Sequence, residues 1–519
     1  MTRPQPEESS VIADFDARRA VTLSARGTRP PTAIVESADA ERAGSGKLAA
    51  RVARRIERDI VAAGWPVGQA LGSEAELRAR YGVSRAVLRE AIRLLEHHQV
   101  AAMRRGPAGG LVVRAPDAGA ATSAMVVYLE FVGSTIEHLL AARLVIEPLA
   151  VGLAAERITE AGISTLRAAL ADEAAAGPGR NVAVRDQLHL TIAELSGNPA
   201  LRLFVDVLLR LTWRYARETL DDPPPEAGSA LAEAHQAHQA MVHAVVSGDA
   251  ARAEMHAARH LESIRDHVLE HSPDPKGQRP RWTMPAAGHT QDQKLAEVVA
   301  QRILSEITGG GWPIGSVIGS EAALLERFEV SRAVLREAVR LLEYHSVARM
   351  RRGPGGGLVV AEPDPSASIE AMALYLDYQG IEIDHLRVVR EAVELDCVQR
   401  VASRVDDAEV AGRLRGLTRP GGAADGVNGV HPGPGGDRQH YRMHLEMAEQ
   451  AGNPVLALFL RILLTLWARQ QNDGPGADPA DTTTGLAHDG IVDALLRGDR
   501  DLARHRMRRH LDALTRWWQ

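Results

Sequence analysis

The chain has 519 residues, of which 45% are apolar and 25% charged, the composition of an ordinary globular protein. This length predicts about three to five domains. The formal net charge of −6 argues against a general polyanion binder. Cys397 is the single cysteine, which excludes an intrachain disulfide and fits a reducing cytoplasm. We find no apolar run of roughly 18 residues and no signal-peptide core. We therefore expect a cytoplasmic protein without a transmembrane helix.

One segment of the chain occurs twice. Residues 47–117 align with residues 294–364 without a gap, and 46 of the 71 positions are identical. The run Ser84–Ala91 recurs unchanged as Ser331–Ala338. A repeat of this length is a duplicated domain rather than a solenoid unit, which spans roughly 20–50 residues. The chain therefore carries two nearly equal copies of one surface.

Both copies of the repeat predict the same order of elements. In the first copy, residues 48–60 place apolar side chains four apart, which predicts a helix. Ser73 and Ser84 are expected N-caps of two further helices, and the first of them opens a capping box. Two short strands are expected over 100–103 and 111–113, with a basic, Gly-rich hairpin between them. The predicted order is a helix, a helix–turn–helix and a two-stranded wing.

The remainder of each copy has a wholly helical pattern. The predicted fold class is therefore mainly α. The expected divisions are a disordered tail (1–46), a winged helix–turn–helix (47–117), an all-α bundle (118–270), a Pro-rich linker (271–293), a second winged helix–turn–helix (294–364) and a second all-α bundle (365–519).

Positive charge gathers on the two repeats. Residues 78–114 contain eight Arg and two Glu, a local balance of +6, and residues 325–361 contain seven Arg and four Glu, a balance of +3. Arg85, Arg89 and Arg93 fall four apart and should form one exposed row on a helix. Such a row is often only a solvated helix face. Here the turn, the wing and the duplication favour a surface that binds a specific anionic partner.

These residues resemble the GntR superfamily of bacterial transcription regulators, and the helical halves resemble the FCD domain of its FadR-like subfamily. The resemblance covers nearly all of 47–270 and 294–519, in the same order twice. It implies that DNA contacts come from the start of each third helix and from each wing. The implied contact residues are Ser84, Arg85, Ala86, Val87, Arg89, Arg105 and Gly106, with Ser331, Arg332, Ala333, Val334, Arg336, Arg352 and Gly353 in the second copy.

Arginine suits this role because its guanidinium can donate two hydrogen bonds to a guanine in the major groove. In the family a further contact often comes from the residue after Ser-Glu, which here is Ala75 or Ala322, so that contact is absent. The equal copies predict double-stranded DNA with inverted-repeat half-sites, read by one chain acting as a pseudo-dimer. The alternative is a homodimer of two such chains on a longer site.

Among the histidines that recur at matching places in the two helical halves are His189, His238 and His260 in the first, and His444, His488 and His510 in the second. In similar FCD domains, histidines at these positions bind a divalent metal. Neutral imidazole suits zinc, nickel, cobalt or manganese. The plain alternative is that they are core histidines hydrogen-bonded to their neighbours.

The sequence departs from the family at the fourth expected metal ligand. An Asp or Asn usually lies four residues before the first His, but this chain has Arg185 in the first copy and His440 in the second. Asp186 lies one residue out of register. The second copy could therefore supply four imidazoles through His440, whereas Arg185 would repel a cation in the first.

Arg143 and Arg390 each begin an Arg-x-x-x-Glu pattern. In relatives this Arg can bind the carboxylate of an organic acid, so the resemblance implies a small organic acid effector. An i,i+4 ion pair with Glu147 or Glu394 is an equally open interpretation.

Together these features predict a sequence-specific DNA-binding transcriptional regulator, favoured as a repressor, that is controlled by a small carboxylate or a divalent metal. The sequence has no motif for a nucleophile, a phosphate loop or a nucleotide fold, so no enzyme and no organic cofactor are expected. A metal-dependent hydrolase that uses the three-His sites is one alternative. A DNA-binding scaffold with decayed sensor pockets is another.

Overall fold

The computed structural model describes residues 45–104, 106, 109–116, 118–175, 182–220, 227–271, 291–344, 346–351, 353, 355–363, 365–417, 438–472 and 482–516. It is mainly helical, with small sheets in two places, as the sequence predicts. The predicted disordered tail lies almost entirely outside the described residues, as does most of the predicted linker. Those two assignments and the domain limits stay predictions.

Winged domain 1 is the described part of residues 45–116, and winged domain 2 is the described part of 291–363. Winged domain 1 consists of α2 (Ser45–Ala62), α3 (Glu74–Tyr81), α4 (Arg85–His97), β1 (Ala101–Arg104) and β2 (Gly110–Val113). Winged domain 2 consists of α12 (Gln291–Gly309), β3 (Val317–Gly319), α13 (Glu321–Phe328), α14 (Arg332–Tyr344), β4 (Ala348–Arg351) and β5 (Gly357–Val360).

The caps expected from the sequence hold the helix–turn–helix in shape. Ser73 Oγ accepts a hydrogen bond from Glu76 N at 3.3 Å. Ser73 N in turn donates to the Glu76 carboxylate at 2.7 Å, which completes the capping box. Ser84 Oγ accepts from Val87 N at 3.3 Å at the start of α4. In the second copy Ser320 and Ser331 cap α13 and α14 in the same way, both at 3.2 Å. These side chains satisfy backbone donors that the first turn of a helix leaves unpaired.

The wing differs from the prediction by one strand. β1 pairs with β2, and β4 with β5, both antiparallel as expected. In winged domain 2 a third strand, β3, also pairs with β5, so the sheet order is β3-β5-β4. Winged domain 1 has a single bridge, Ala70 to Val112, at the aligned position. A strand of three residues is too short to give an alternating pattern in the sequence.

Helical domain 1 is the described part of residues 118–271, and helical domain 2 is the described part of 365–516. Helical domain 1 consists of α5 (Ala118–Phe131), α6 (Ile136–Glu156), α7 (Glu160–Ala175), α8 (Val182–Leu195), α9 (Pro199–Leu220), α10 (Ala227–Val246) and α11 (Ala250–His271). Helical domain 2 consists of α15 (Pro365–Tyr378), α16 (Ile383–Ala402), α17 (Ala408–Leu417), α18 (Arg438–Gln450), α19 (Pro454–Asn472), α20 (Thr482–Leu496) and α21 (Arg500–Arg516).

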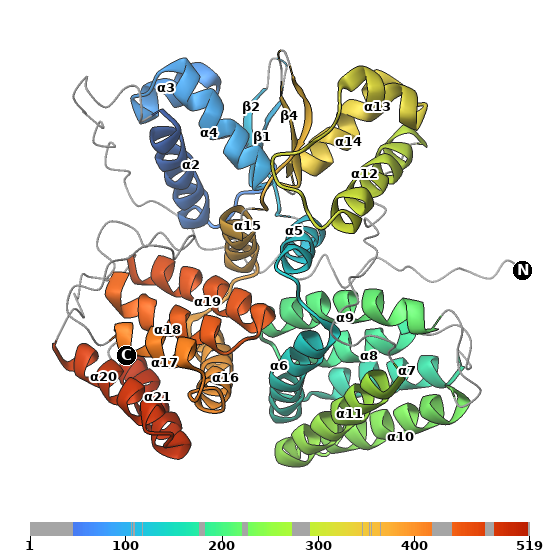
Figure 1. The fold of residues 1–519 in the computed structure, drawn as a ribbon, viewed down its shortest axis with the longest axis vertical. Helices are drawn as coiled ribbons and strands as arrows, with labels where there is room; N and C mark the ends of the chain where they lie inside the picture. Colours follow the sequence, from blue (N-terminus) through green and yellow to red (C-terminus); the bar gives the residue numbers. More distant parts are fainter. Residues whose placement is uncertain are drawn as a thin grey trace, which may run out of the picture.

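The two copies are crossed in space. Winged domain 1 lies above α15, and winged domain 2 lies above α5, so each winged domain rests on the first helix of the other copy (Figure 1). Leu374 of α15 belongs to the buried core of winged domain 1. Edge-to-face ring pairs mark both contacts: Trp65 with Tyr378, and Phe131 with Trp312, each with centroids 5.4 Å apart. The sequence analysis did not predict this crossing.

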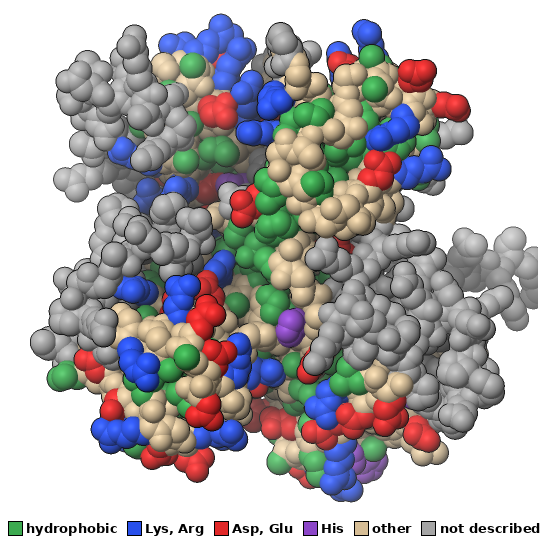
Figure 2. All heavy atoms as spheres, in the orientation of Figure 1, with side chains coloured by type: hydrophobic (Ala, Val, Ile, Leu, Met, Phe, Trp, Pro, Cys, Tyr) green, Lys and Arg blue, Asp and Glu red, His purple; other side chains and the backbone are tan. Residues whose placement is uncertain are grey.

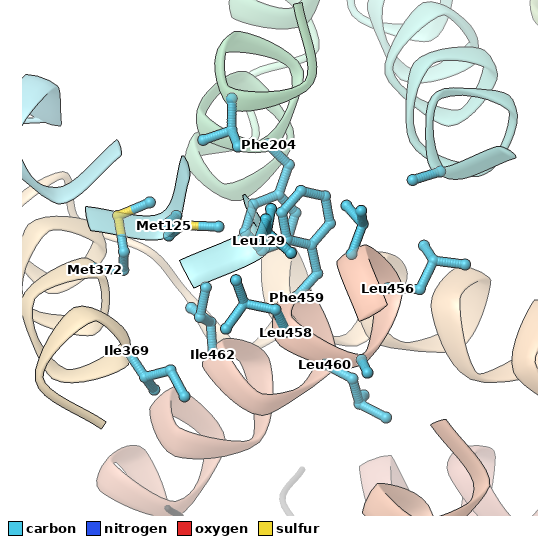
Figure 3. Packing of buried hydrophobic residues seen from close by; sticks show 14 of the residues in the cluster. Met125, Leu129, Phe204, Ile369, Met372, Leu456, Leu458, Phe459, Leu460 and Ile462 are labelled. Carbon is cyan, nitrogen blue, oxygen red and sulfur yellow. The ribbon is translucent and has the colours of Figure 1, made fainter. Parts of the chain in front are cut away.

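Pseudo-symmetric contacts join the two helical domains. Phe204 of α9 and Phe459 of α19 stack with centroids 3.9 Å apart, within a shared apolar core (Figure 3). Asn198 Nδ2 donates to the carbonyl of His385 on α16, and Asn453 Nδ2 donates to the carbonyl of His138 on α6, both at 3.0 Å. Contacts that recur with the copies exchanged are those of a two-fold interface, built here within one chain.

One helix bears on the expectation that the chain has no transmembrane segment. Among the described residues, α6 alone is long and apolar enough to cross a membrane, with a mean hydropathy of 1.5 in its best window. However, 61% of that window is buried inside the protein. It also carries the buried ion pair of Arg143 and Glu147. These features match the core helix of a bundle, so α6 is weak evidence for a membrane span.

Candidate nucleic-acid interface and histidine clusters

The predicted Arg row is exposed along α4. The side chains of Arg85, Arg89 and Arg93 are 63%, 59% and 74% exposed. On α14, Arg332 is exposed, and the side chains of Arg336 and Arg340 are 69% and 74% exposed. Figure 2 shows Lys and Arg side chains over the tops of both winged domains, with more acidic groups among them on winged domain 2. This matches the local balances of +6 and +3 in the sequence.

A carboxylate that the sequence analysis did not single out orients the Arg row. Arg85 Nε donates to Glu74 Oε1 at 2.7 Å, and Arg89 Nε lies 3.6 Å from the same oxygen. In winged domain 2, Arg336 Nε lies 3.8 Å from Glu321 Oε1. The Ser-Glu pair preserved in both copies was the available signal. Because the pairs are exposed, phosphate or guanine could displace the carboxylate at little cost.

The structure narrows the list of predicted DNA contacts. Ser84, Ala86, Ser331 and Ala333 are exposed beside the Arg residues. The side chains of Val87 and Val334, by contrast, are only 7% and 4% exposed and belong to the winged-domain cores. We therefore withdraw these two as side-chain contacts, because their methyl groups pack inward.

Only part of each wing tip is described. Gly106 and Gly353 are exposed, with φ of +115° and +98°, a conformation that glycine adopts without strain. Arg105 and Arg352 lie outside the described residues. Their predicted entry into the minor groove stays a prediction.

The three matched histidines of helical domain 1 meet in one buried cluster. His189, His238 and His260 come from α8, α10 and α11 and are 7%, 1% and 4% exposed. Each offers a ring nitrogen within 4.8 Å of the others. His238 Nε2 and His260 Nε2 are 3.0 Å apart.

Two carboxylates fix the ring orientation in this cluster. Glu147 Oε2 lies 2.8 Å from His189 Nδ1, and Glu173 accepts from His238 Nδ1 at 2.9 Å. The Nε2 atoms of those rings consequently face the centre. Burial by itself raises the pKa of Glu173, yet the hydrogen bond from His238 and its charge leave the pKa below the ordinary value. Burial and the neighbouring histidines lower the pKa of His260 to about 2, so its ring is neutral.

Helical domain 2 has a second cluster of the same kind. His444, His488 and His510 come from α18, α20 and α21. His510 Nε2 is 3.1 Å from His488 Nε2 and 3.2 Å from His444 Nε2. His444 Nδ1 is hydrogen-bonded to Glu394. Burial lowers the pKa of His444 well below its ordinary value, and burial with the neighbouring histidines lowers that of His510 to about 2.

Both clusters fit a divalent cation. Metal–nitrogen bonds of about 2.0–2.1 Å in a tetrahedral site would separate two ligand nitrogens by about 3.3 Å. The Nε2 pairs here are 3.0–3.2 Å apart. Imidazole rings held through Nδ1 by carboxylates are the usual ligand arrangement, because the hydrogen bond fixes the ring orientation. Glu147 and Glu173 were missed in this role. The side chains of Arg185 and His440 lie outside the described residues, so the fourth-ligand predictions stay open.

Arg143 and Arg390 are both buried, 4% and 2% exposed, and both pair with the glutamate four residues on. The ion-pair interpretation is thus confirmed for each. Arg143 Nε and Nη2 both face Glu147. Arg390 Nε donates to Glu394 at 2.6 Å, but its Nη2 lies 3.5 Å from His444 Nε2. Each guanidinium therefore lies beside a histidine cluster.

A winged helix–turn–helix with an exposed Arg row, followed by a helical bundle with a buried polar cluster, defines a DNA-binding regulator with a sensor domain. Sequence profiles of known families agree. The profile of the gntR family of bacterial regulatory proteins matches residues 48–111 and 295–358, and that of the FCD domain matches 138–263 and 385–513. The chain belongs to the gntR family and carries each domain twice.

Several relatives are HTH-type transcriptional regulators. RmpR of Mycobacterium gastri is 28% identical over 167 residues, which span 31% of this chain and 57% of RmpR. The repressor NanR of Enterobacter sp. (strain 638) is 26% identical over 44% of this chain and 86% of NanR. YcbG of Bacillus subtilis is 26% identical over 42% of this chain and 87% of YcbG. One copy of the repeat thus corresponds to most of NanR or YcbG.

Among solved structures, Streptococcus agalactiae GntR is 22% identical to this chain, with a TM-score of 0.33 over 42% of this chain and 99% of that one. E. coli McbR/YncC is 17% identical, with a TM-score of 0.21 over 43% of this chain and 97% of that one.

Proposed function

We propose that this chain is a cytoplasmic transcriptional repressor that reads an inverted-repeat operator as a single-chain pseudo-dimer. The observation that carries the proposal is the pairing of two nearly identical recognition helices, α4 and α14, on one pseudo-symmetric helical core. Covalent linkage places the second winged domain near the DNA at an effective concentration of about millimolar once the first is bound. The two half-sites should be almost alike, because Ser84–Ala91 and Ser331–Ala338 are identical.

Selection of bound fragments from random duplex DNA tests this proposal. We expect an enriched palindrome, and the mass of the isolated complex should correspond to one chain per palindrome. A mass of two chains on one palindrome would rule out the pseudo-dimer and favour the homodimer. Absence of any enrichment over genomic competitor DNA would contradict operator binding itself.

We further propose that the His clusters hold a divalent metal, through His189, His238 and His260 in one helical domain and His444, His488 and His510 in the other. When bound, the metal would supply a Lewis-acidic cation for the oxygen of a small carboxylate. The residues of the chain orient the imidazoles through Glu147, Glu173 and Glu394 and place Arg143 and Arg390 nearby.

Metal analysis of protein purified without chelators tests this proposal by counting the metal ions bound per chain. The wild type should carry up to two metal ions per chain, and His260→Ala should lower this by one because one of three ligands is lost. His510→Ala should lower it by one in the other domain. His256→Ala, on the same helix as His260 but outside the cluster, is the matched control. If the wild type contained only trace metal, the metal proposal would be wrong and both clusters would be ordinary core histidines.

Control of the operator would be allosteric. A carboxylate or metal in a helical domain would bias the packing of its first helix, and the crossing places that helix under the winged domain of the other copy. Coupling of about 1–3 kcal/mol would give roughly 5–150-fold control of operator affinity.

A further inference from the structure

The two winged domains carry different charge around the same recognition residues. Over the aligned repeats, residues 47–117 contain 13 Lys and Arg against 7 Asp and Glu, a net charge of +6. Residues 294–364 contain 9 of each kind, a net charge of zero. The stretches Ser84–Ala91 and Ser331–Ala338 are nevertheless identical. The copies have thus kept the residues assigned to base contact and changed the charge that surrounds them.

Part of this difference lies on the first helix of each winged domain. Three exposed arginines of α2 have uncharged counterparts at the aligned positions of α12. The arginines are Arg51, Arg54 and Arg58, and the counterparts are Val298, Gln301 and Ser305. The surface of α2 is therefore more positive than that of α12.

The change closest to the recognition helix lies in the helix–turn–helix. Two exposed carboxylates, Glu326 and Glu329, precede α14 where winged domain 1 has Ala79 and Gly82. Glu329 lies three residues before Arg332, so their Cα atoms are at most about 11 Å apart. This separation is about one Debye length at 0.1 M salt. A carboxylate there should repel the phosphates of a half-site bound by Arg332.

Glu329 has a backbone conformation that glutamate disfavours. Its φ and ψ are +52° and +44°, and Gly82 has +65° and +36° at the same place. Glycine adopts this left-handed region without steric cost, whereas a residue with a Cβ is strained there. Because glycine forms the same turn in the first copy, the fold does not require the glutamate. Strain of this kind is typical of functional positions.

We infer that the two winged domains bind the same half-site sequence with unequal affinity, and that Glu326 and Glu329 help to make winged domain 2 the weaker DNA-binding domain. Attraction to phosphates supplies the non-specific part of DNA affinity and steers the approach, so winged domain 1 should bind first. Winged domain 2 then reaches the second half-site through the covalent tether. The inference rests on the proposed function, since it concerns the same operator.

The test uses the full chain and a duplex that holds one half-site of the selected palindrome within scrambled sequence. Arg332→Ala leaves winged domain 1 with an intact recognition helix, and Arg85→Ala leaves winged domain 2. In fluorescence anisotropy at low salt, we expect the Arg332→Ala chain to bind this duplex about tenfold more tightly than the Arg85→Ala chain. Its logarithmic salt slope should be steeper by about 0.9 for each additional phosphate contact.

Exchanging the charges should narrow this difference. Glu326→Ala with Glu329→Gly gives winged domain 2 the residues of winged domain 1. Added to Arg85→Ala, the pair should raise affinity for the half-site duplex about threefold. Glu362→Ala is the matched control, because it also replaces an exposed carboxylate by the residue of the first copy. Glu362 follows β5 at the end away from the hairpin tip, so this change should leave affinity unchanged.

Ala79→Glu makes the opposite change in winged domain 1, at an exposed helical position where left-handed strain plays no part. Added to Arg332→Ala, it should weaken binding of the half-site duplex. Equal affinity and equal salt slopes of the Arg85→Ala and Arg332→Ala chains would overturn the inference. So would a charge exchange in winged domain 2 that changes binding no more than Glu362→Ala does.

Binding of the wild type to the full palindrome and to scrambled DNA is measured in parallel. If the wild type prefers the palindrome, equal behaviour of the two single variants rejects this inference alone. If the wild type shows no preference, the proposed function itself is rejected.

Discussion

Replacing Arg85 and Arg332 together with alanine should reduce operator binding to its non-specific level. Each guanidinium lies at the first turn of a recognition helix, is exposed, and can contact a guanine edge. Loss of one bidentate contact costs about 1–3 kcal/mol, so the two should cost about 2–6 kcal/mol if separate half-sites contribute additively. Fluorescence anisotropy with operator and scrambled duplexes measures the change.

The control lies on the same helices. Arg93 and Arg340 end the exposed rows and pair with Glu90 and Glu337 at 2.8 and 2.9 Å. Their double replacement should weaken operator and scrambled DNA alike and reduce the salt slope by about one per lost phosphate contact. The Arg85 and Arg332 changes should instead erase the preference for the operator. Unchanged operator affinity in that double variant would show that the contact assignment is wrong.

The local structure could be predicted from the sequence because each helix start depends on residues that are close together in the chain. Ser73 and Ser84 predict helix starts from a side chain that bonds within its own first turn. The His clusters were also predictable, since the three cluster histidines recur in both copies whereas others, such as His256, have no counterpart. A single copy would not have separated His260 from His256.

Features that depend on distant partners could not be read in this way. The crossing places Leu374 in the core of a winged domain almost 300 positions earlier, although its own helix reads as an ordinary buried segment. Glu147 was recognised as a partner of Arg143 but not of His189, because the ring lies on another helix. A buried polar group finds its partner in space, and spacing along the chain does not encode that choice.

Replacing Arg469 with methionine should loosen winged domain 1 and leave winged domain 2 intact. Arg469 of α19 donates to Asp377 at 3.0 Å and also pairs with Glu370, both on α15 beneath winged domain 1. Its charge also lowers the pKa of the buried Glu57 on α2. Removing the cation takes the Arg469 partner from Glu370 and Asp377 and removes one of the charges that lower the pKa of Glu57. Because both ion pairs of Arg469 are partly exposed, we expect the variant to lose free energy of unfolding toward the lower end of about 3–5 kcal/mol.

The duplication supplies the control for Arg469→Met. Leu304 stands in winged domain 2 where Glu57 stands in winged domain 1, and it is fully buried. Hydrogen exchange should therefore accelerate in α2 and α4 but not in α12 and α14. Adding Glu57→Leu to the variant should restore part of the protection, because it removes one of the three carboxylates near the lost cation. Equal acceleration in both winged domains would mean that Arg469 stabilises the whole core rather than this contact.

The stability of winged domain 1 should also depend on pH, through the buried pair of His98 and Glu57. His98 Nδ1 lies 2.7 Å from Glu57 Oε1; burial by itself lowers the pKa of His98, but the hydrogen bond and charge of Glu57 leave it raised. A raised pKa means that the stabilisation is fully present below the ordinary value of 6.5 and is lost as pH rises through the native value. Exchange in α2 and α4 should thus accelerate, relative to α12 and α14, as the pH rises above neutrality. His98→Gln should remove that difference, and a pH profile identical in wild type and variant would place the titrating group elsewhere.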